Sequence, residues 1–294
     1  MVSYYEKLIQ LFWLMRPLNS ITAGIAVITA TFLANSGNNS PFLINVYLGM
    51  GFAAFFTTAQ AMVHNDIVDI EADKINYPSR ALPSGKISPI EAKLFAFILF
   101  IFACIAGIYI DAYISINFPI SLFWAFLNSI LLDIYNKWIK RSGLIGNLIV
   151  AYVVWALFIY ADIVINQRLT LLTQSIGLYA FFWNWGREIF KDIMDIEGDR
   201  EFGLNTIPVR YGAKNGAYIG TFFIIIAIIW SIPIILLPNP IMIPILLISI
   251  DFIILYKSIQ IIRKLENEYI YKSKRLFMRL MFLAVIIIGL SNLI

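Results

Sequence analysis

The sequence is poor in the residues that soluble and disulfide-rich proteins depend on. Of its 294 residues, one is a cysteine (Cys104), one is a histidine (His64) and 14% are charged. A single cysteine excludes a disulfide framework and a cysteine-ligated metal site, and soluble domains usually carry about 25% charged residues. In their place, 60% of the residues are hydrophobic. We predict an all-α membrane protein, because helices satisfy their backbone polar groups within a bilayer and the sequence has no alternating segments typical of membrane barrels.

Nine apolar segments are long enough to cross the hydrocarbon core, which takes about 20 residues per helix. They are residues 18–34, 42–63, 89–110, 118–136, 144–163, 169–190, 215–236, 241–257 and 276–293. If the N-terminus is cytoplasmic, every Lys and Arg of the 22 except Arg168 falls on the cytoplasmic side, as the positive-inside rule requires. We therefore predict one integral-membrane domain, residues 1–294, in the cell membrane with its C-terminus outside.

Two acidic segments repeat each other almost letter for letter. Residues 66–73 read D-I-V-D-I-E-A-D, and residues 192–199 read D-I-M-D-I-E-G-D. Both follow predicted spans at their cytoplasmic ends, and four spans separate them, so the two segments lie on the same face of the membrane. This pattern predicts two four-helix halves related by an internal repeat, with the ninth helix left over and an acidic site on the cytoplasmic face.

The spacing of the aspartates predicts their chemistry. Residues three and four apart share one face of a helix, so each motif forms one stripe of carboxylates: Asp66, Asp69 and Asp73 in the first, and Asp192, Asp195 and Asp199 in the second. Like charges 4 Å apart repel by about 4 kcal/mol at an effective dielectric near 20, so cations must compensate. Oxygen ligands suit Mg²⁺, which often bridges to substrate phosphates. The alternative, solvated carboxylates paired with Lys74 and Arg200, is less favoured because the pattern is repeated.

Basic residues near these motifs fit a phosphorylated ligand, because guanidinium and ammonium groups bind phosphate oxygens. Each one taken singly could instead anchor lipid headgroups. Three stand out: Lys191 lies one turn before Asp195, Lys140 follows Tyr135 at a helix end, and Arg80 lies in the loop P-S-R-A-L-P-S-G, which reads as a formed turn. Polar residues in or beside spans are also functional candidates; they include Arg16, Asn19, Asn65, Asn128, Asp133, Asn184 and Asp251.

These motifs together resemble the UbiA-type intramembrane prenyltransferases. Residues 65–73 look like the family's N-D-x-x-D-x-x-x-D motif, and residues 195–199, with Lys191 four residues before them, look like its second motif. Arg16-Pro17-x-Asn19, Arg80-Ala81-Leu82-Pro83-x-Gly85 and Thr206-Ile207-Pro208 are also similar to family segments. Where quinone-type members have tyrosine, this chain has Arg187. The run from Arg187 to Asp192 most resembles the archaeal branch, the geranylgeranylglyceryl phosphate geranylgeranyltransferases.

The resemblance implies a Mg²⁺-dependent enzyme. It would transfer a geranylgeranyl group from geranylgeranyl diphosphate to a lipid-phosphate acceptor and form the second ether bond of archaeal membrane lipids. The implied metal ligands are Asn65, Asp66, Asp69, Asp73, Asp192, Asp195 and Asp199. The implied catalytic residues are Asp69, Asp73, Asp195, Asp199 and Lys191, and the implied substrate-binding residues are Arg16, Asn19, Arg80, Tyr135, Lys140 and Arg187. An extra arginine at 187 suits an acceptor that carries its own phosphate.

Two alternatives remain open. The same fold could prenylate an aromatic or quinone-precursor acceptor. A cation or phosphate transporter is disfavoured, because transporters place coupling residues near the bilayer midplane and these carboxylates gather at one surface. The expected partners are membrane lipid and the two substrates, and nucleic-acid binding is not expected.

Overall fold

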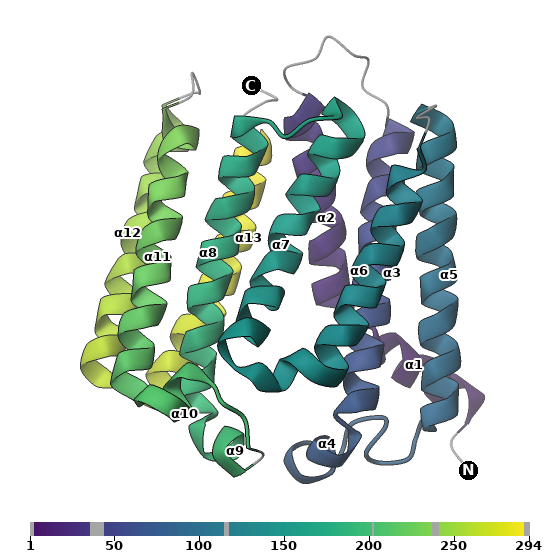
Figure 1. The fold of residues 1–294 in the computed structure, drawn as a ribbon, viewed down its shortest axis with the longest axis horizontal. Helices are drawn as coiled ribbons and strands as arrows, with labels where there is room; N and C mark the ends of the chain where they lie inside the picture. Colours follow the sequence, from purple (N-terminus) through teal and green to yellow (C-terminus); the bar gives the residue numbers. More distant parts are fainter. Residues whose placement is uncertain (1–2, 36–43, 115–117, 202, 237–240, 291–294) are drawn as a thin grey trace. The chain divides into compact units, whose positions relative to one another are not determined.

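The computed structural model describes residues 3–35, 44–114, 118–201, 203–236 and 241–290, and these ranges contain helices and no strands (Figure 1). The α-helices are α1 (Tyr4–Leu14), α2 (Pro17–Asn35), α3 (Ile44–Val68), α4 (Ile70–Asn76), α5 (Pro89–Ile114), α6 (Ile120–Ile134), α7 (Leu144–Asn166), α8 (Leu171–Met194), α9 (Ile196–Glu201), α10 (Ile207–Tyr211), α11 (Ala213–Ile235), α12 (Met242–Lys264) and α13 (Asn267–Leu290). A π-helical turn, Tyr135–Ile139, and a 3₁₀ turn, Lys140–Ser142, connect α6 to α7.

Each of the nine predicted segments coincides with a long helix, although the ends differ. Within the described residues, six helices are long and apolar enough to span a membrane: α2, α3, α5, α7, α11 and α12. The other three do not meet that description. Helix α6 has 15 residues, and α8 and α13 carry several charged residues within their length. The all-helical membrane class is confirmed, and the count of nine spans stays a prediction.

The chain divides into two compact units, which share helix α2. The first comprises residues 1–28 and 41–137, and the second comprises residues 29–40 and 138–294. In the first unit, α3 packs against α5 and α6, and α1 lies against α3. Helix α1 begins with a capping box, in which the Glu6 backbone N–H donates to Ser3 Oγ and the Ser3 N–H donates to the Glu6 carboxylate. The single-domain prediction is not tested by this division.

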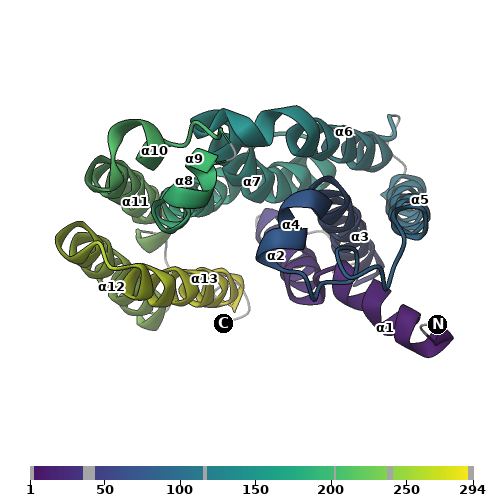
Figure 2. The same ribbon diagram turned by 90° about the horizontal axis from the view of Figure 1, so that it is seen from below.

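In the second unit, α8 packs against α7, α11 and α13 (Figure 2). Glycines allow this close packing. A Cβ on Gly186 would lie 2.6 Å from the Gly220 carbonyl oxygen, and a Cβ on Gly220 would lie 2.7 Å from the Phe190 ring. Small residues at helix interfaces are typical of membrane bundles, where close backbone approach provides much of the attraction. Gly186 and Gly220 therefore fix how closely α11 approaches the polar end of α8.

Two buried aspartates outside the acidic motifs, Asp162 and Asp251, stabilise helix contacts. Asp251 accepts hydrogen bonds from the Tyr179 hydroxyl (2.7 Å) and the Ser231 hydroxyl (2.6 Å), so three helices of the second unit meet at one carboxylate. Asp162, fully buried, accepts from the side chains of Asn166, Thr170 and Gln174. A buried carboxylate is costly unless it is hydrogen-bonded, and these partners satisfy it. Asp251, which the sequence marked as a functional candidate, thus links neighbouring helices.

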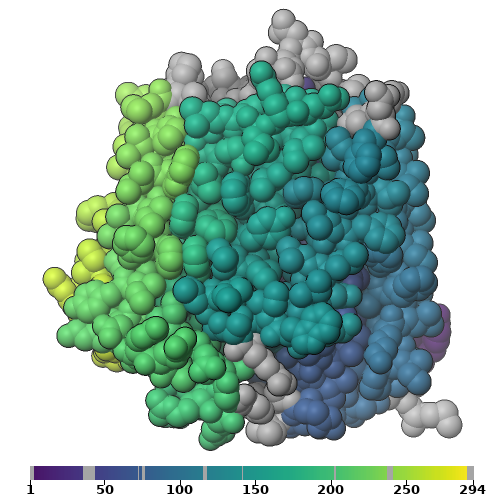
Figure 3. Space-filling view, in the orientation of Figure 1, coloured from purple at the N-terminus to yellow at the C-terminus, as the bar shows by residue number. Residues whose placement is uncertain are grey.

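The outward surfaces of the helices are apolar. On α11, the side chains of Tyr218, Phe222, Ile225, Ile229 and Ile232 are 44–57% exposed and recur every three to four residues. Such spacing places them on one face of the helix, and α11 lies on the side drawn in Figure 3, where it appears in light green. A stripe of this kind would be unfavourable in water, and it is the surface expected of a helix that contacts lipid tails.

Candidate active site

The first acidic motif lies where α3 meets α4. Asn65 and Asp66 belong to the last turn of α3, Asp69 stands between the two helices, and Asp73 lies in α4. The predicted stripe therefore crosses a break in the helix, because Asp69 has φ −87° and ψ 3° and the regular helix ends there. This bridge region is sparsely populated and often holds active-site residues. The register is kept, since the Asp69 N–H donates to the Asn65 carbonyl (3.0 Å) and the Asp73 N–H donates to the Asp69 carbonyl (2.8 Å).

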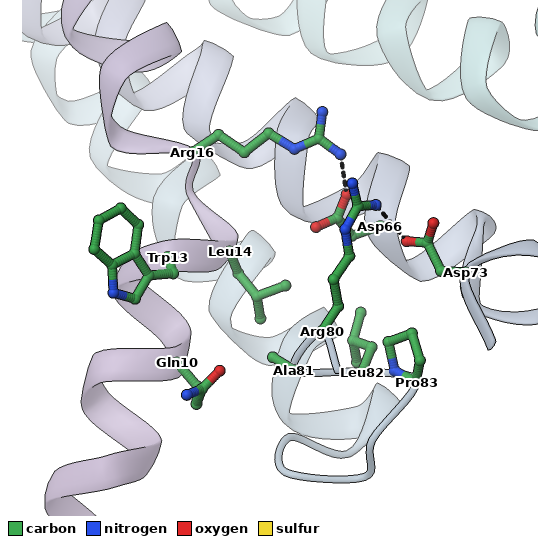
Figure 4. A pocket seen from close by; sticks show the side chains of 10 residues that line it. All are labelled: Gln10, Trp13, Leu14, Arg16, Asp66, Asp73, Arg80, Ala81, Leu82 and Pro83. Carbon is green, nitrogen blue, oxygen red and sulfur yellow. Dashed lines mark hydrogen bonds and ion pairs between the residues drawn. The ribbon is translucent and has the colours of Figure 1, made fainter. Parts of the chain in front are cut away.

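Two arginines hold the first motif, as Figure 4 shows. The Arg16 guanidinium donates to Asp66 Oδ1 at 2.5 Å, and the Arg80 guanidinium donates to Asp73 Oδ2 at 2.7 Å. Both aspartates are buried, 7% and 6% exposed, so the arginines supply charge that water does not. The third aspartate of the motif, Asp69, accepts a hydrogen bond from the Asn65 side-chain amide at 3.0 Å.

Arg16, Asp66, Asp73 and Arg80 line a cavity of about 300 Å³ in the first unit (Figure 4). Its other walls come from α1 and from the loop after α4; they are Gln10, Trp13, Leu14, Ala81, Leu82 and Pro83. A cavity that combines carboxylates with guanidinium groups can accept an anion together with a cation. It is of a size suited to a small phosphorylated group.

The loop that carries Arg80 is ordered by hydrogen bonds and by burial. The Ser84 N–H donates to the Arg80 carbonyl, and the Ile87 N–H donates to the Ala81 carbonyl. Ala81, Leu82 and Ile87 are buried in an apolar cluster with residues of α1, α3 and α5. The prediction of a formed turn is confirmed. The Arg80 guanidinium also lies 4.0 Å from the Tyr77 ring centroid, a cation–π contact that further restricts its position.

Arg16 adopts an unusual backbone conformation. It lies between α1 and α2 with φ 45°, in the left-handed region that favours glycine. Strain of this kind persists where the surrounding structure requires it and clusters at functional sites. Pro17 follows as the first residue of α2, so the chain turns sharply and directs Arg16 toward Asp66 (Figure 4). The Asn19 amide donates to the Met62 sulfur at 3.8 Å, and its role in substrate binding stays a prediction.

The second acidic motif has the same local form. Asp192 belongs to α8, Asp195 stands between α8 and α9, and Asp199 lies in α9. Asp195 has φ −98° and ψ 7°, close to the values at Asp69. The Asp199 N–H donates to the Asp195 carbonyl at 2.8 Å, which matches the bond between Asp73 and Asp69. Here too the regular helix is interrupted at the middle aspartate of the motif.

Neutral side chains hold the second motif. The Asn147 amide donates to Asp192 at 2.7 Å, and the Thr206 hydroxyl donates to Asp199 at 3.1 Å. Burial raises the pKa of Asp199; the Thr206 hydrogen bond opposes this shift, while the Asp195 carboxylate adds to it. Among the residues that the structure describes, no arginine pairs with these two carboxylates as Arg16 and Arg80 pair with the first motif, and Lys191 is the basic residue whose charge acts on both.

The basic residues predicted around the second motif lie in two places: Arg187 and Lys191 on α8, and Lys140 in the 3₁₀ turn before α7. The Arg187 guanidinium donates to Asn184 Oδ1 at 2.9 Å and to the Glu188 carboxylate, and Lys191 Nζ lies 3.6 Å from Glu188. Lys140 belongs to the turn that Gly143 ends. A Cβ on Gly143 would lie 1.9 Å from the Asn205 carbonyl oxygen, so this turn packs closely against the chain that follows the second motif.

The site residues thus form two groups, one in each unit. The first group is Arg16, Asn65, Asp66, Asp69, Asp73 and Arg80, and the second is Arg187, Lys191, Asp192, Asp195 and Asp199. Tyr135 lies in the first unit and Lys140 in the second. That the two acidic motifs form one site on the same face of the membrane stays a prediction.

The lone histidine is structural in form. His64 Nδ1 contacts the Asp133 carboxylate, which the Gln60 amide also approaches at 3.4 Å. All three residues lie in α3 and α6. His64 is therefore a hydrogen-bonded residue that links these two helices.

The donor chemistry of the motifs fits Mg²⁺. Across the described ranges no three His, Cys, Asp or Glu side chains come together as a ready-made metal cluster. Mg²⁺ does not require one, because it usually binds through one or two carboxylates and completes its shell with water and substrate phosphates. Each motif by itself offers such carboxylates: Asp66, Asp69 and Asp73 in the first, and Asp192, Asp195 and Asp199 in the second.

Sequence reasoning missed three residues that the structure places near the second motif: Asn147, Glu188 and Lys274. Asn147 and Glu188 are polar residues inside predicted spans, which is itself a functional signal. Lys274 lies outside the predicted ninth span, 276–293, because α13 begins earlier, at Asn267. A single sequence offered no sign that this lysine would lie beside α8.

The fold and the paired acidic motifs define an intramembrane prenyltransferase. The model of the UbiA prenyltransferase family matches residues 23–286, and the chain belongs to this family. It is 33% identical over 290 residues to a protein named digeranylgeranylglyceryl phosphate synthase from Methanocaldococcus jannaschii, covering 97% of each chain. It is 37% identical over 231 residues to a protein of the same name from Methanococcus aeolicus, covering 78% of this chain and 76% of the relative.

Solved structures agree with this assignment. A structure concerned with digeranylgeranylglyceryl phosphate synthase in membranes matches with a TM-score of 0.76 and 32% identity, over 98% of this chain and 99% of the other. A UbiA homolog from Archaeoglobus fulgidus bound to DMAPP and Mg²⁺ matches with a TM-score of 0.64 and 18% identity, over 94% of this chain and 99% of that one. The second match supports the fold alone.

Proposed function

We propose that this protein transfers a geranylgeranyl group from geranylgeranyl diphosphate to geranylgeranylglyceryl phosphate, forming the second ether bond of archaeal membrane lipids. The observation that carries the proposal is identity along nearly the whole chain to a relative named for this product. Arg187 adds support from the site, because its guanidinium lies one turn before Lys191 on α8 and suits an acceptor that carries a phosphate.

The two acidic motifs would both bind Mg²⁺ together with the donor diphosphate. Three observations support this part of the proposal: the motifs share a sequence, they share a backbone break at the middle aspartate, and both offer carboxylate oxygens. When bound, Mg²⁺ supplies positive charge that stabilises the departing diphosphate.

The protein's own residues would bind, orient and shield the reactants. Arg16, Arg80, Tyr135, Lys140 and Lys191 would hold diphosphate oxygens, so the C1–O bond of the allylic donor breaks toward a fixed positive environment. The acceptor hydroxyl oxygen then forms a bond to C1, and its proton passes to a motif carboxylate or to the departing diphosphate. The bound substrates would exclude water from the site, which would otherwise capture the allylic cation.

The site would face the cytoplasm within a single membrane domain. The basic residues support this orientation, since all of them except Arg168 fall on the proposed cytoplasmic side of the nine predicted spans. Fluorescent or protease reporters fused to the termini would test it, with the N-terminus inside and the C-terminus outside as the expected result.

Product analysis by mass spectrometry tests the activity. Purified protein in detergent is incubated with Mg²⁺, geranylgeranyl diphosphate and either geranylgeranylglyceryl phosphate or an aromatic acid acceptor. We expect digeranylgeranylglyceryl phosphate from the first mixture and no prenylated product from the second. Transfer to the aromatic acceptor alone would replace the proposal with a quinone-type activity.

A further inference from the structure

A lysine of the last helix lies beside the second acidic motif. Helix α13 runs antiparallel to α8 and packs against it (Figure 1). The contact is fixed by the rings of Phe190 and Phe277, both fully buried, with centroids 6.0 Å apart. Lys274 lies one helical turn before Phe277. Because the helices run in opposite directions, that turn brings Lys274 to the level of the residues that follow Phe190.

Lys274 thereby joins a compact group of charges that we call the α8–α13 cationic cluster: Arg187, Lys191 and Lys274 around Glu188. Arg187 pairs with one oxygen of the Glu188 carboxylate, and Lys191 lies 3.6 Å from the other. Lys274 interacts electrostatically with all three and with Asp195. The Arg187 and Glu188 side chains are 13% and 10% exposed, so water screens them weakly.

The charges of this cluster do not balance. Three cations surround one carboxylate, which leaves a net charge of +2 for the four side chains. A single cation would compensate Glu188, so the remaining positive charges repel one another unless an anion is bound between them. Asp192 and Asp195 lie next to the cluster, but in the proposed function they bind the metal. The net charge of +2 balances that of a doubly negative ligand, such as a phosphate group.

We infer that the α8–α13 cationic cluster binds the phosphate of the lipid acceptor through Arg187 and Lys274, with Lys274 as a contact residue that α13 contributes, while Lys191 stays with the donor diphosphate. This inference rests on the proposed function, and it deepens it by adding a residue from the last helix and by giving Glu188 a role. Glu188 acts as a positioning residue, because its two oxygens hold Arg187 and Lys191 on one side of α8. A phosphate monoester and the donor diphosphate share the same oxygen chemistry, so the test must separate them.

The test measures binding of two acceptors that differ only in the phosphate. Geranylgeranylglyceryl phosphate and geranylgeranylglycerol are titrated by calorimetry into detergent-purified protein, without donor and with EDTA. We compare wild type with Lys274→Gln, Lys274→Met and Lys274→Arg. The matched control is Lys272→Gln, which removes the same charge from α13 but at a side chain that is 71% exposed and paired with Glu268.

Wild type should prefer the phosphorylated acceptor, and Lys274→Gln and Lys274→Met should each lose about tenfold of that preference, the value of one charge-assisted hydrogen bond. Lys274→Arg and Lys272→Gln should keep it, and the KM for geranylgeranyl diphosphate should not change in any of the four variants. An unchanged preference in both neutral variants overturns the inference, as does an equal loss of donor and acceptor binding, which would assign the cluster to the diphosphate.

The two failures can be told apart. If the neutral variants behave as wild type while wild type still makes digeranylgeranylglyceryl phosphate, the inference is wrong and the proposed function stands. If wild type forms no such product and does not distinguish the two acceptors, the proposed function fails and the inference fails with it.

Discussion

The buried Glu188 provides a quantitative test of the charge arrangement on α8. Replacing Glu188 with glutamine keeps the size of the side chain and one acceptor oxygen but removes the negative charge between Arg187 and Lys191. Breaking a buried ion pair by removing one partner costs about 3–5 kcal/mol. We expect the lower end, about 3 kcal/mol, because glutamine still accepts one hydrogen bond and the Lys191 side chain is 45% exposed. At about 2 °C per kcal/mol for a chain of this size, the midpoint of thermal unfolding should fall by about 6 °C.

The assay is thermal unfolding of detergent-purified protein, followed by loss of the monodisperse peak in size-exclusion chromatography. Glu268→Gln is the matched control, because Glu268 also pairs with a lysine one turn away but its side chain is 78% exposed. Exposed pairs contribute little to stability, so this control should unfold with wild type. If Glu188→Gln unfolds within 1 °C of wild type, the carboxylate carries no buried charge and the argument for the α8–α13 cationic cluster loses its basis.

Three further predictions concern the site. Asp69→Ala and Asp195→Ala should each abolish prenyl transfer while the protein elutes as a single folded peak; retained turnover in the product assay would exclude a metal role. Arg187→Tyr should raise the KM of the phosphorylated acceptor more than that of the donor, and equal changes in steady-state kinetics would refute its assignment. Gly143→Ala should lower the unfolding midpoint, because its Cβ would meet a carbonyl oxygen at 1.9 Å and its φ is +61°, whereas Gly198→Ala, with open space around the new Cβ, should not.

Much of the fold could be predicted from the sequence because membrane helices depend on local composition. Each predicted apolar segment is a helix, and the turn that carries Arg80 was predicted from its prolines and glycine. The ends were harder to place. Helix α3 continues past residue 63 to Val68, and α8 continues past residue 190 to Met194, because hydropathy falls before the helical hydrogen bonds end. Both helices therefore continue into the polar residues of the motifs, beyond the ends that hydropathy predicts.

The site was predictable in its residue types and less so in its partners. The spacing of the aspartates identified the motifs, but the spacing could not reveal that Arg16 would reach Asp66 across 50 residues of sequence or that Asn147 would bind Asp192 across 45. Such pairs depend on which helices pack together, and a single sequence does not contain that information. The position of Lys274 beside α8 could not be predicted for the same reason, since it depends on the contact between Phe190 and Phe277.

The backbone break at the middle aspartate is the strongest structural argument that the two motifs arose as a repeat. Outside the motifs the two halves share little sequence, so shared letters alone could reflect a common ligand. Asp69 and Asp195 nevertheless share φ and ψ within about 11° and 4° (−87° and 3° against −98° and 7°). Each accepts the N–H of the third aspartate at 2.8 Å. The two motifs therefore share a backbone conformation as well as a sequence, and a common ligand alone does not require both.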